Sequence, residues 1–277
     1  MTRTSLLCLA AVLVGTLSVS GATARLLPVA VNRWLEVSQL QGTVNFRTSG
    51  QAVRPARRGV RLRSPGDAIS TGSNATTVLA IDTGIGSILV SEKTGVQVRA
   101  METLADGGHI TKLQITGGQV RVRVRRFTHP SSQLELQTPA GISGVRGTVF
   151  GVSVQPDGKT GVATLEGRVV SSAQGKVVSL NSGFQTLIVP GQPPTPPVPL
   201  RQDTRLNITL LGAETAETAR ISGQTDPVNL VLFANQPIVL DRQGNFNVQA
   251  PIASGRIVDA TVITPLGKRQ VYRLLVP

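Results

Sequence analysis

Short apolar segments separated by glycine run through most of this chain and restrict it to β-structure. Between residues 34 and 188 the apolar residues alternate with polar ones over short stretches, and almost nothing shows the 3.6-residue period of a helix. Residues 138–154 carry this pattern most densely, with glycines set around β-branched and aromatic residues. Strands this short and regularly spaced favour a sandwich, a barrel or a β-solenoid. The predicted fold class is all-β.

Turn residues predict where the strands reverse. Residues 112–124 read KLQITGGQVRVRV, and Gly117-Gly118 fits a two-residue hairpin loop because both positions tolerate positive φ. Residues 77–81 and 86–90 are predicted strands joined by a tight turn at residues 82–84. Residues 212–219 (GAETAETA) are the stretch that best fits a short helix.

The N-terminus predicts an exported protein. Arg3 is followed by an apolar run at residues 5–19 and by Ala22-Thr23-Ala24, which fits the small-x-small cleavage rule, so residues 1–24 read as a signal peptide. The alternative is a membrane anchor, but the run is shorter than the roughly 20 residues that a span needs. Cleavage would remove Cys8, the only cysteine, so a packed core and not disulfides must hold the remaining chain together.

Proline divides the rest of the chain. Residues 190–199 read PGQPPTPPVP, a composition that favours an extended, semi-rigid spacer. We therefore expect a β domain at 25–189, a linker at 190–203 and a second β domain at 204–277; the alternative is that the proline segment packs as a strap on the first domain. Several strand-like segments and the turn at residues 241–244 make a small immunoglobulin-like sandwich the expected form of the second domain.

Three different segments carry glycine-containing motifs. They are GVRL with PGDAISTG at residues 59–72, TP with GVRGTVF at residues 138–150, and LEGRVV with VSLNSG at residues 165–183. Their motif residues are Gly66, Asp67, Gly72, Thr138, Pro139, Arg146, Gly147, Thr148, Phe150, Glu166 and Gly167. In this order they resemble the FecR domain, an extracytoplasmic module of bacterial iron-siderophore regulators that also occurs in other exported proteins.

The resemblance implies a β-rich, non-enzymatic periplasmic or secreted module that binds or senses. In regulators of that pathway, the resemblance implies a cytoplasmic anti-sigma segment and a membrane span before the periplasmic domain. Here a predicted signal peptide comes first instead. Direct control of a sigma factor is therefore not expected. Residues 241–246 (DRQGNF) are similar to bacterial immunoglobulin-like repeats.

Several motif residues also have expected structural roles. Gly66 and Asp67 fit a turn between strands, and Arg146 lies between glycines that allow close backbone approach. Its guanidinium is expected to bind a carboxylate or carbonyl groups, with Asp67 and Glu166 as candidate partners. The alternative is contact with an anionic ligand.

The sequence offers few candidate residues for catalysis or for metal binding. With Cys8 removed, the chain has no cysteine and only two histidines, His109 and His129. Both are predicted to lie in loops, so neither a metal nor another cofactor is expected. Asp82 and Glu92 are a carboxylate pair that could meet in space, which keeps a carbohydrate-active enzyme as an alternative. We expect no enzymatic activity.

Basic residues are the remaining indication of function. Without residues 1–24 the chain has 27 lysines and arginines against 15 acidic residues, which favours anionic partners. The candidate binding residues are Arg121, Arg123, Arg125, Arg126, Arg57, Arg58 and Arg61. Alternation with valine places the first three on one face of a strand, which is either a solvated face or a surface for an anionic cell-envelope polymer. A protein partner is the rival hypothesis. Nucleic acid is not expected, because export and the scarcity of aromatic residues oppose it.

Overall fold

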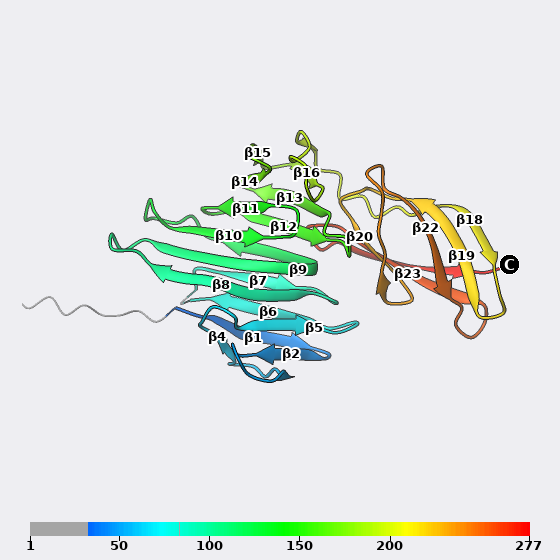
Figure 1. Ribbon diagram of the computed structural model, residues 1–277, viewed down its shortest axis with the longest axis horizontal. Coiled ribbons are helices and arrows are strands. Elements are labelled where there is room, and N and C mark those ends of the chain that lie inside the picture. Colours follow the sequence, from blue (N-terminus) through cyan, green and yellow to red (C-terminus); the bar gives the residue numbers. More distant parts are fainter. Residues whose placement is uncertain (1–32, 83) are drawn as a thin grey trace, which may run out of the picture. The chain divides into compact units, whose positions relative to one another are not determined.

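The structure, a computed structural model, describes residues 33–82 and 84–277, and β-strands are the only regular elements among them (Figure 1). The all-β prediction is confirmed. The predicted signal peptide at residues 1–24 lies outside the described residues. Within the described ranges, no helix has the length and apolar character needed to cross a membrane.

Two large sheets form the first part of the structure. The first contains β1 (Leu35–Gln41), β4 (Arg61–Leu62), β6 (Thr76–Ile81), β7 (Gly86–Val90), β9 (His109–Val124), β12 (Val149–Val154), β13 (Thr160–Glu166), β16 (Phe184–Ile188) and β17 (Val198–Pro199). Its order is β4-β1-β6-β7-β9-β12-β13-β16-β17, and every neighbouring pair is antiparallel.

The second sheet shares β9 with the first. Its other strands are β2 (Val44–Arg47), β3 (Arg54–Pro55), β5 (Ala68–Thr71), β8 (Gly95–Thr103), β10 (Gln133–Gln137), β11 (Ile142–Val145), β14 (Arg168–Ala173) and β15 (Lys176–Asn181). The order is β3-β2-β5-β8-β9-β10-β11-β14-β15, with one parallel pair, β9 and β10. The sheets do not close into a barrel.

The glycine pair in β9 is not a hairpin loop, so that prediction is wrong. The half of β9 before Gly117 pairs with β8 and β10, and the half after Gly118 pairs with β7 and β12. One continuous strand therefore passes from one sheet to the other, as corner strands do in packed sheets. Gly118 adopts φ +89°, which a residue with a Cβ rarely does, so the pair permits a bend in the strand and not a reversal.

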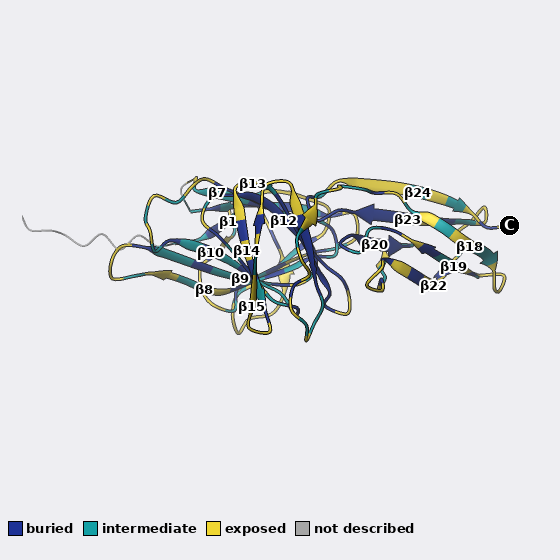
Figure 2. Cartoon of the chain, turned by 90° about the horizontal axis from the view of Figure 1, so that it is seen from above, coloured by how far each residue is buried: buried dark blue, intermediate teal, exposed yellow. Residues whose placement is uncertain are grey.

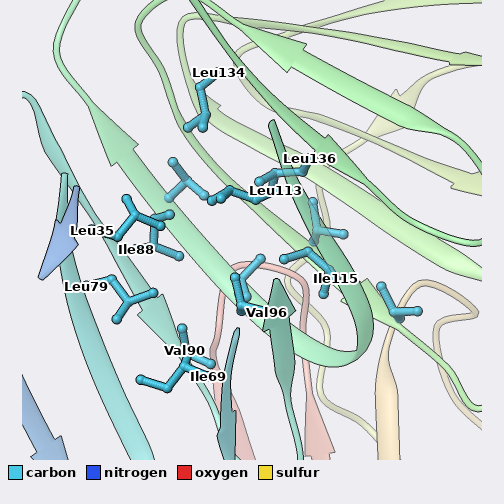
Figure 3. Packing of buried hydrophobic residues seen from close by; sticks show 14 of the residues in the cluster. Leu35, Ile69, Leu79, Ile88, Val90, Val96, Leu113, Ile115, Leu134 and Leu136 are labelled. Carbon is cyan, nitrogen blue, oxygen red and sulfur yellow. The ribbon is translucent and has the colours of Figure 1, made fainter. Parts of the chain in front are cut away.

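The core of this sandwich lies between the two sheets. Figure 3 shows Leu35, Leu79 and Ile88 from the first sheet near Ile69 and Val96 from the second, and each is at most 1% exposed. The alternation seen in the sequence produces this layer, because every second side chain of a strand points to the same face. Figure 2 shows that buried residues lie along the strands, whereas exposed residues lie in the turns and along outer strands such as β24 (Arg269–Leu275).

Two other local predictions have opposite outcomes. Strands β6 and β7 form the expected antiparallel pair, with Ile81 opposite Gly86. The expected short helix at residues 212–219 is wrong, because its ends belong to strands and a tight turn connects them. Thr215 closes this turn by accepting a hydrogen bond from the backbone N–H of Thr218 at 3.0 Å, which satisfies the backbone without a helix.

The proline segment lies against the first sandwich. Strand β17 pairs with β16, the hydroxyl of Thr186 donates to the carbonyl oxygen of Thr195 at 2.6 Å, and the N–H of Leu187 donates to the Thr195 hydroxyl at 3.0 Å. These contacts hold the segment against the edge of the first sheet. The domain boundaries at 25–189, 190–203 and 204–277 stay a prediction.

The C-terminal strands form a smaller two-sheet sandwich. They are β18 (Asn207–Ala213), β19 (Thr218–Gln224), β20 (Leu230–Phe233), β21 (Gln236–Pro237), β22 (Asn245–Pro251), β23 (Ile257–Ile263) and β24 (Arg269–Leu275). The sheets have the orders β18-β19-β22 and β21-β20-β23-β24, and Phe233 packs on Phe246 across them with ring centroids 5.4 Å apart. An immunoglobulin-like topology remains a prediction, which this strand order supports.

Candidate functional site

The first motif segment has a structural role. Asp67 is 3% exposed, and its carboxylate accepts hydrogen bonds from the backbone N–H groups of Ser49 (3.0 Å), Arg63 (2.8 Å) and Ser64 (3.1 Å). It therefore ties two turns together. Gly66 beside it adopts φ +93°, which explains why the motif has glycine there. The carboxylate is engaged by these three N–H groups and does not bind Arg146, so the predicted pairing of Asp67 with Arg146 is wrong.

The second motif segment closes a turn and supplies the core. Thr138 donates its backbone N–H to the carbonyl of Gly141 at 2.8 Å and so closes the turn between β10 and β11. Pro139 lies in this turn, and Phe150 is fully buried in the sandwich core. These residues shape the fold and do not form a site.

The glycines of the second and third motif segments bring three pieces of backbone together. A Cβ on Gly147 would lie 2.9 Å from the backbone nitrogen of Arg126, and a Cβ on Gly167 would lie 2.6 Å from the carbonyl oxygen of Gly147. Only glycine permits so close an approach. The segment after β9, the loop before β12 and the turn after β13 are therefore stacked against one another.

Backbone hydrogen bonds hold the segment after β9 in place. The N–H of Phe127 donates to the carbonyl of Arg146 at 2.9 Å, the N–H of Arg125 donates to Ile85 at 3.1 Å, and Val124 and Thr148 exchange two bonds of 3.0 Å. Arginine side chains thus project from a fixed backbone, although the segment itself belongs to no strand.

Two adjoining hollows open on this surface. One, of about 530 Å³, is lined by residues 84–87, 123–126, 147–149, 166 and 167. The other, of about 960 Å³, is lined by residues 126–128, 130, 146, 147, 167, 168 and 181. They share Arg126, Gly147 and Gly167, and we call the two together the arginine groove.

The arginine groove carries a strong positive charge. Five arginines line it: Arg123, Arg125, Arg126, Arg146 and Arg168. Glu166 is the one acidic residue among the lining side chains. Across residues 33–82 and 84–277, these five arginines form no ion pair. Uncompensated charge around a concave surface raises the local concentration of anions.

Two of these arginines bond to neutral oxygens. Arg146 donates to the carbonyl of His129 at 3.1 Å, the carbonyl partner that the sequence left open, and Arg168 donates from Nε to the side-chain oxygen of Asn181 at 3.1 Å. Both guanidinium groups keep their charge and further N–H donors. Beside His129, a hydrogen bond from the Ser131 hydroxyl lowers the pKa of Asp106.

The predicted basic residues do not form one surface. Arg123, Arg125 and Arg126 line the groove, but Arg121 lies farther along β9, is half-buried and lines neither hollow. Arg57, Arg58 and Arg61 lie around β4, which three strands separate from β9 in the first sheet, roughly 20 Å at the usual strand spacing.

The β4 cluster is also partly neutralised. Arg61 donates to Glu36 at 2.7 Å and stacks on the Trp34 ring, 4.3 Å from its centroid. The groove instead gains Arg168, which sequence reasoning did not select. Its position directly after Glu166-Gly167 was the available signal.

The carboxylates considered for catalysis are committed to other contacts. Asp82 pairs with Arg33 at 2.8 Å, and Glu92 pairs with Arg269 at 3.2 Å. Each therefore stabilises a guanidinium and is poorly placed to exchange a proton with a substrate. Among the residues with described positions, no three His, Cys, Asp or Glu side chains converge on a possible metal site.

Residues 67–170 match the family model of the FecR protein. This segment is therefore FecR-like. The matched segment runs from Asp67 through β5 into β14 and contains most of the residues that line the arginine groove. This confirms the resemblance drawn from the three motif segments.

Solved structures include distant likenesses. Two crystal structures of a protein described as a candidate anti-sigma factor from Parabacteroides distasonis ATCC 8503 have a TM-score of 0.41 and 17% identity, covering 48% of this chain and 59% of theirs. A polysaccharide lyase has a TM-score of 0.20 and 10% identity over 88% of this chain and 40% of its own. This chain thus spans little more than half of the first protein's length, and no curated protein matches it.

Proposed function

We propose that this protein is an exported, non-enzymatic module of the bacterial cell envelope that binds an anionic polymer through the arginine groove. The observation that carries the proposal is the gathering of five arginines without ion-pair partners around one concave surface. The FecR family match supports a sensing or regulatory role at the envelope. The bound polymer would be the signal that such a module senses.

Cell-wall sacculi provide the direct test. The purified protein is co-sedimented with sacculi across a salt series, beside a variant with Arg123, Arg125 and Arg126 changed to Ala. If each exposed contact is worth about 0.5 kcal/mol, the variant binds roughly tenfold more weakly at low salt. Retention of the native protein should fall steeply with salt, because exposed charges are screened.

A second variant separates the groove from overall charge. Changing Arg57, Arg58 and Arg63 to Ala removes the same number of charges from exposed positions around β4. It should bind sacculi as the native protein does. Equal weakening of the two variants, or no retention at low salt, would refute the proposal.

A protein partner is the second candidate function, and one feature favours it. Ile142, Val170 and Val177 are 40%, 43% and 65% exposed and lie on the neighbouring strands β11, β14 and β15. Such a partner would be captured independently of salt and lost when these side chains are changed to serine. A carbohydrate-active enzyme would instead show turnover that depends on a carboxylate.

A further inference from the structure

We infer that the arginine groove binds a linear polymer with an oxyanion in each repeat, and that this bound polymer lies across the ends of β7, β9, β12 and β13. This rests on the proposed function and narrows it. The alternatives within polyanion binding are a diffuse surface attraction and a single anion in one hollow.

Continuity of the two hollows argues for an extended ligand. They meet at Arg126, Gly147 and Gly167, and together they reach from the turn at residues 84–87 to Asn181. The strands β7, β9, β12 and β13 are consecutive neighbours in the first sheet, so three strand spacings give a length of roughly 14 Å for that part alone. One carboxylate or phosphate would fill only a small part of it.

The distribution of charge along the groove argues for repeated anions. Arg123 and Arg125 line the first hollow only, Arg126 lines both, and Arg146 and Arg168 line the second only. A ligand with a single charge could bind some of these groups but not all. A chain with regularly placed charges engages them together, and each further contact is then intramolecular.

The kind of cation restricts the kind of anion. All the basic side chains that line the groove are arginines. A guanidinium presents parallel N–H donors that match the two oxygens of a carboxylate or of a phosphodiester, and it does so with fixed geometry. The shared ligand chemistry is therefore a two-oxygen anion, from either a uronate polysaccharide or a phosphodiester polymer.

Defined oligomers of two kinds test the inference with the full protein. Fluorescently labelled oligogalacturonate and oligo(glycerol phosphate), from one repeat to about eight repeats, are titrated and followed by fluorescence anisotropy, with neutral dextran as the control. Affinity for at least one series should rise by about tenfold or more with length and then stop rising once the groove is filled. The series that binds identifies the source of the anion.

Three variants show where the bound polymer lies. Changing Arg146 and Arg168 to Ala should remove most of the gain with length, while Arg57 and Arg58 changed to Ala should keep it. Changing Arg126 to Lys keeps the charge but removes the paired donors, so it should also weaken binding severalfold. Folding of each variant is checked by its thermal unfolding midpoint.

The outcomes separate this inference from the proposed function. Sacculus binding that depends on the groove, with no dependence on oligomer length, would overturn the linear-chain inference and leave the proposed function standing. Oligomer binding that is equally strong in the Arg146/Arg168 variant would also overturn it. Loss of both sacculus and oligomer binding in the native protein would refute the two together.

Discussion

The bend of β9 between the two sheets makes a sharp prediction about neighbouring glycines. A Cβ at Gly118 would lie 2.6 Å from the Cα of Thr94 and 2.7 Å from the carbonyl oxygen of Lys93, and both are backbone atoms that cannot move cheaply. A Cβ at Gly117 would meet nothing within 4 Å. Gly118 has φ +89°, whereas Gly117 does not have a positive φ.

The cost of Gly118→Ala follows from these two facts. Left-handed backbone costs an alanine about 1–2 kcal/mol, and overpacking against a fixed neighbour adds about 1–3 kcal/mol. We expect a loss of about 3 kcal/mol in the free energy of unfolding, which lowers the thermal midpoint by roughly 6–12 °C for a protein of this size. Gly117→Ala should change the free energy of unfolding by less than about 0.5 kcal/mol.

Urea unfolding followed by circular dichroism measures both changes. The Thr94 hydroxyl, which accepts a hydrogen bond from the Gln119 N–H at 2.9 Å, would also have to move in the Gly118 variant. In a two-residue hairpin both glycines would occupy special backbone angles and both substitutions would be costly. Equal destabilisation by the two alanines would therefore refute the continuous strand.

Three further predictions concern single side chains. Thr148→Val removes a buried hydroxyl with no hydrogen-bond partner among the described residues, so the free energy of unfolding should rise by about 1 kcal/mol in urea titrations; a clear loss would contradict this. Arg33→Met leaves Asp82 unpaired in a site where the two side chains are 7% and 9% exposed, so calorimetry should show a loss of about 3–5 kcal/mol, and a loss below 1 kcal/mol would show that the pair is dispensable. Hydrogen bonds from the Arg205 side chain lower the pKa of Asp203, so this carboxylate contributes stability above pH of about 4 and loses it as the pH falls further. Asp203→Asn should therefore be slightly less stable than the native protein at pH 7, by a small margin because solvent screens the pair, and the difference should shrink as the pH falls below about 4; a difference that does not change with pH would contradict the assignment.

The alternation of apolar residues was sufficient to predict the fold class and many of the strands. Strands β6 and β7 lie where the pattern placed them, because a two-residue period fixes which side chains face the core. Local pattern could not settle Gly117-Gly118, since a glycine pair suits a reversal and a bend equally well. Only the pairing of β9 with four other strands distinguishes the two.

The candidate site was predictable only in part, for a similar reason. Arg123, Arg125 and Arg126 are close in sequence and stood out as a cluster, whereas Arg146 and Arg168 join them only because glycines let separate segments touch. Arg57 and Arg58 looked equally basic but lie elsewhere in the sheet. Charge density along the sequence reports local composition and does not report which loops a fold brings together.

The salt dependence of oligomer binding tests the groove most directly. The affinity of the native protein and of the Arg123/Arg125/Arg126-to-Ala variant for one anionic oligomer is measured from low to high salt, and the logarithm of affinity is plotted against the logarithm of salt concentration. For single-stranded polyanions, each contact contributes about 0.7 to the magnitude of this slope. The slope of the Arg123/Arg125/Arg126-to-Ala variant should therefore be smaller in magnitude by about 2, whereas the Arg57/Arg58/Arg63-to-Ala control should keep the native slope. Identical slopes in all three proteins would contradict the account.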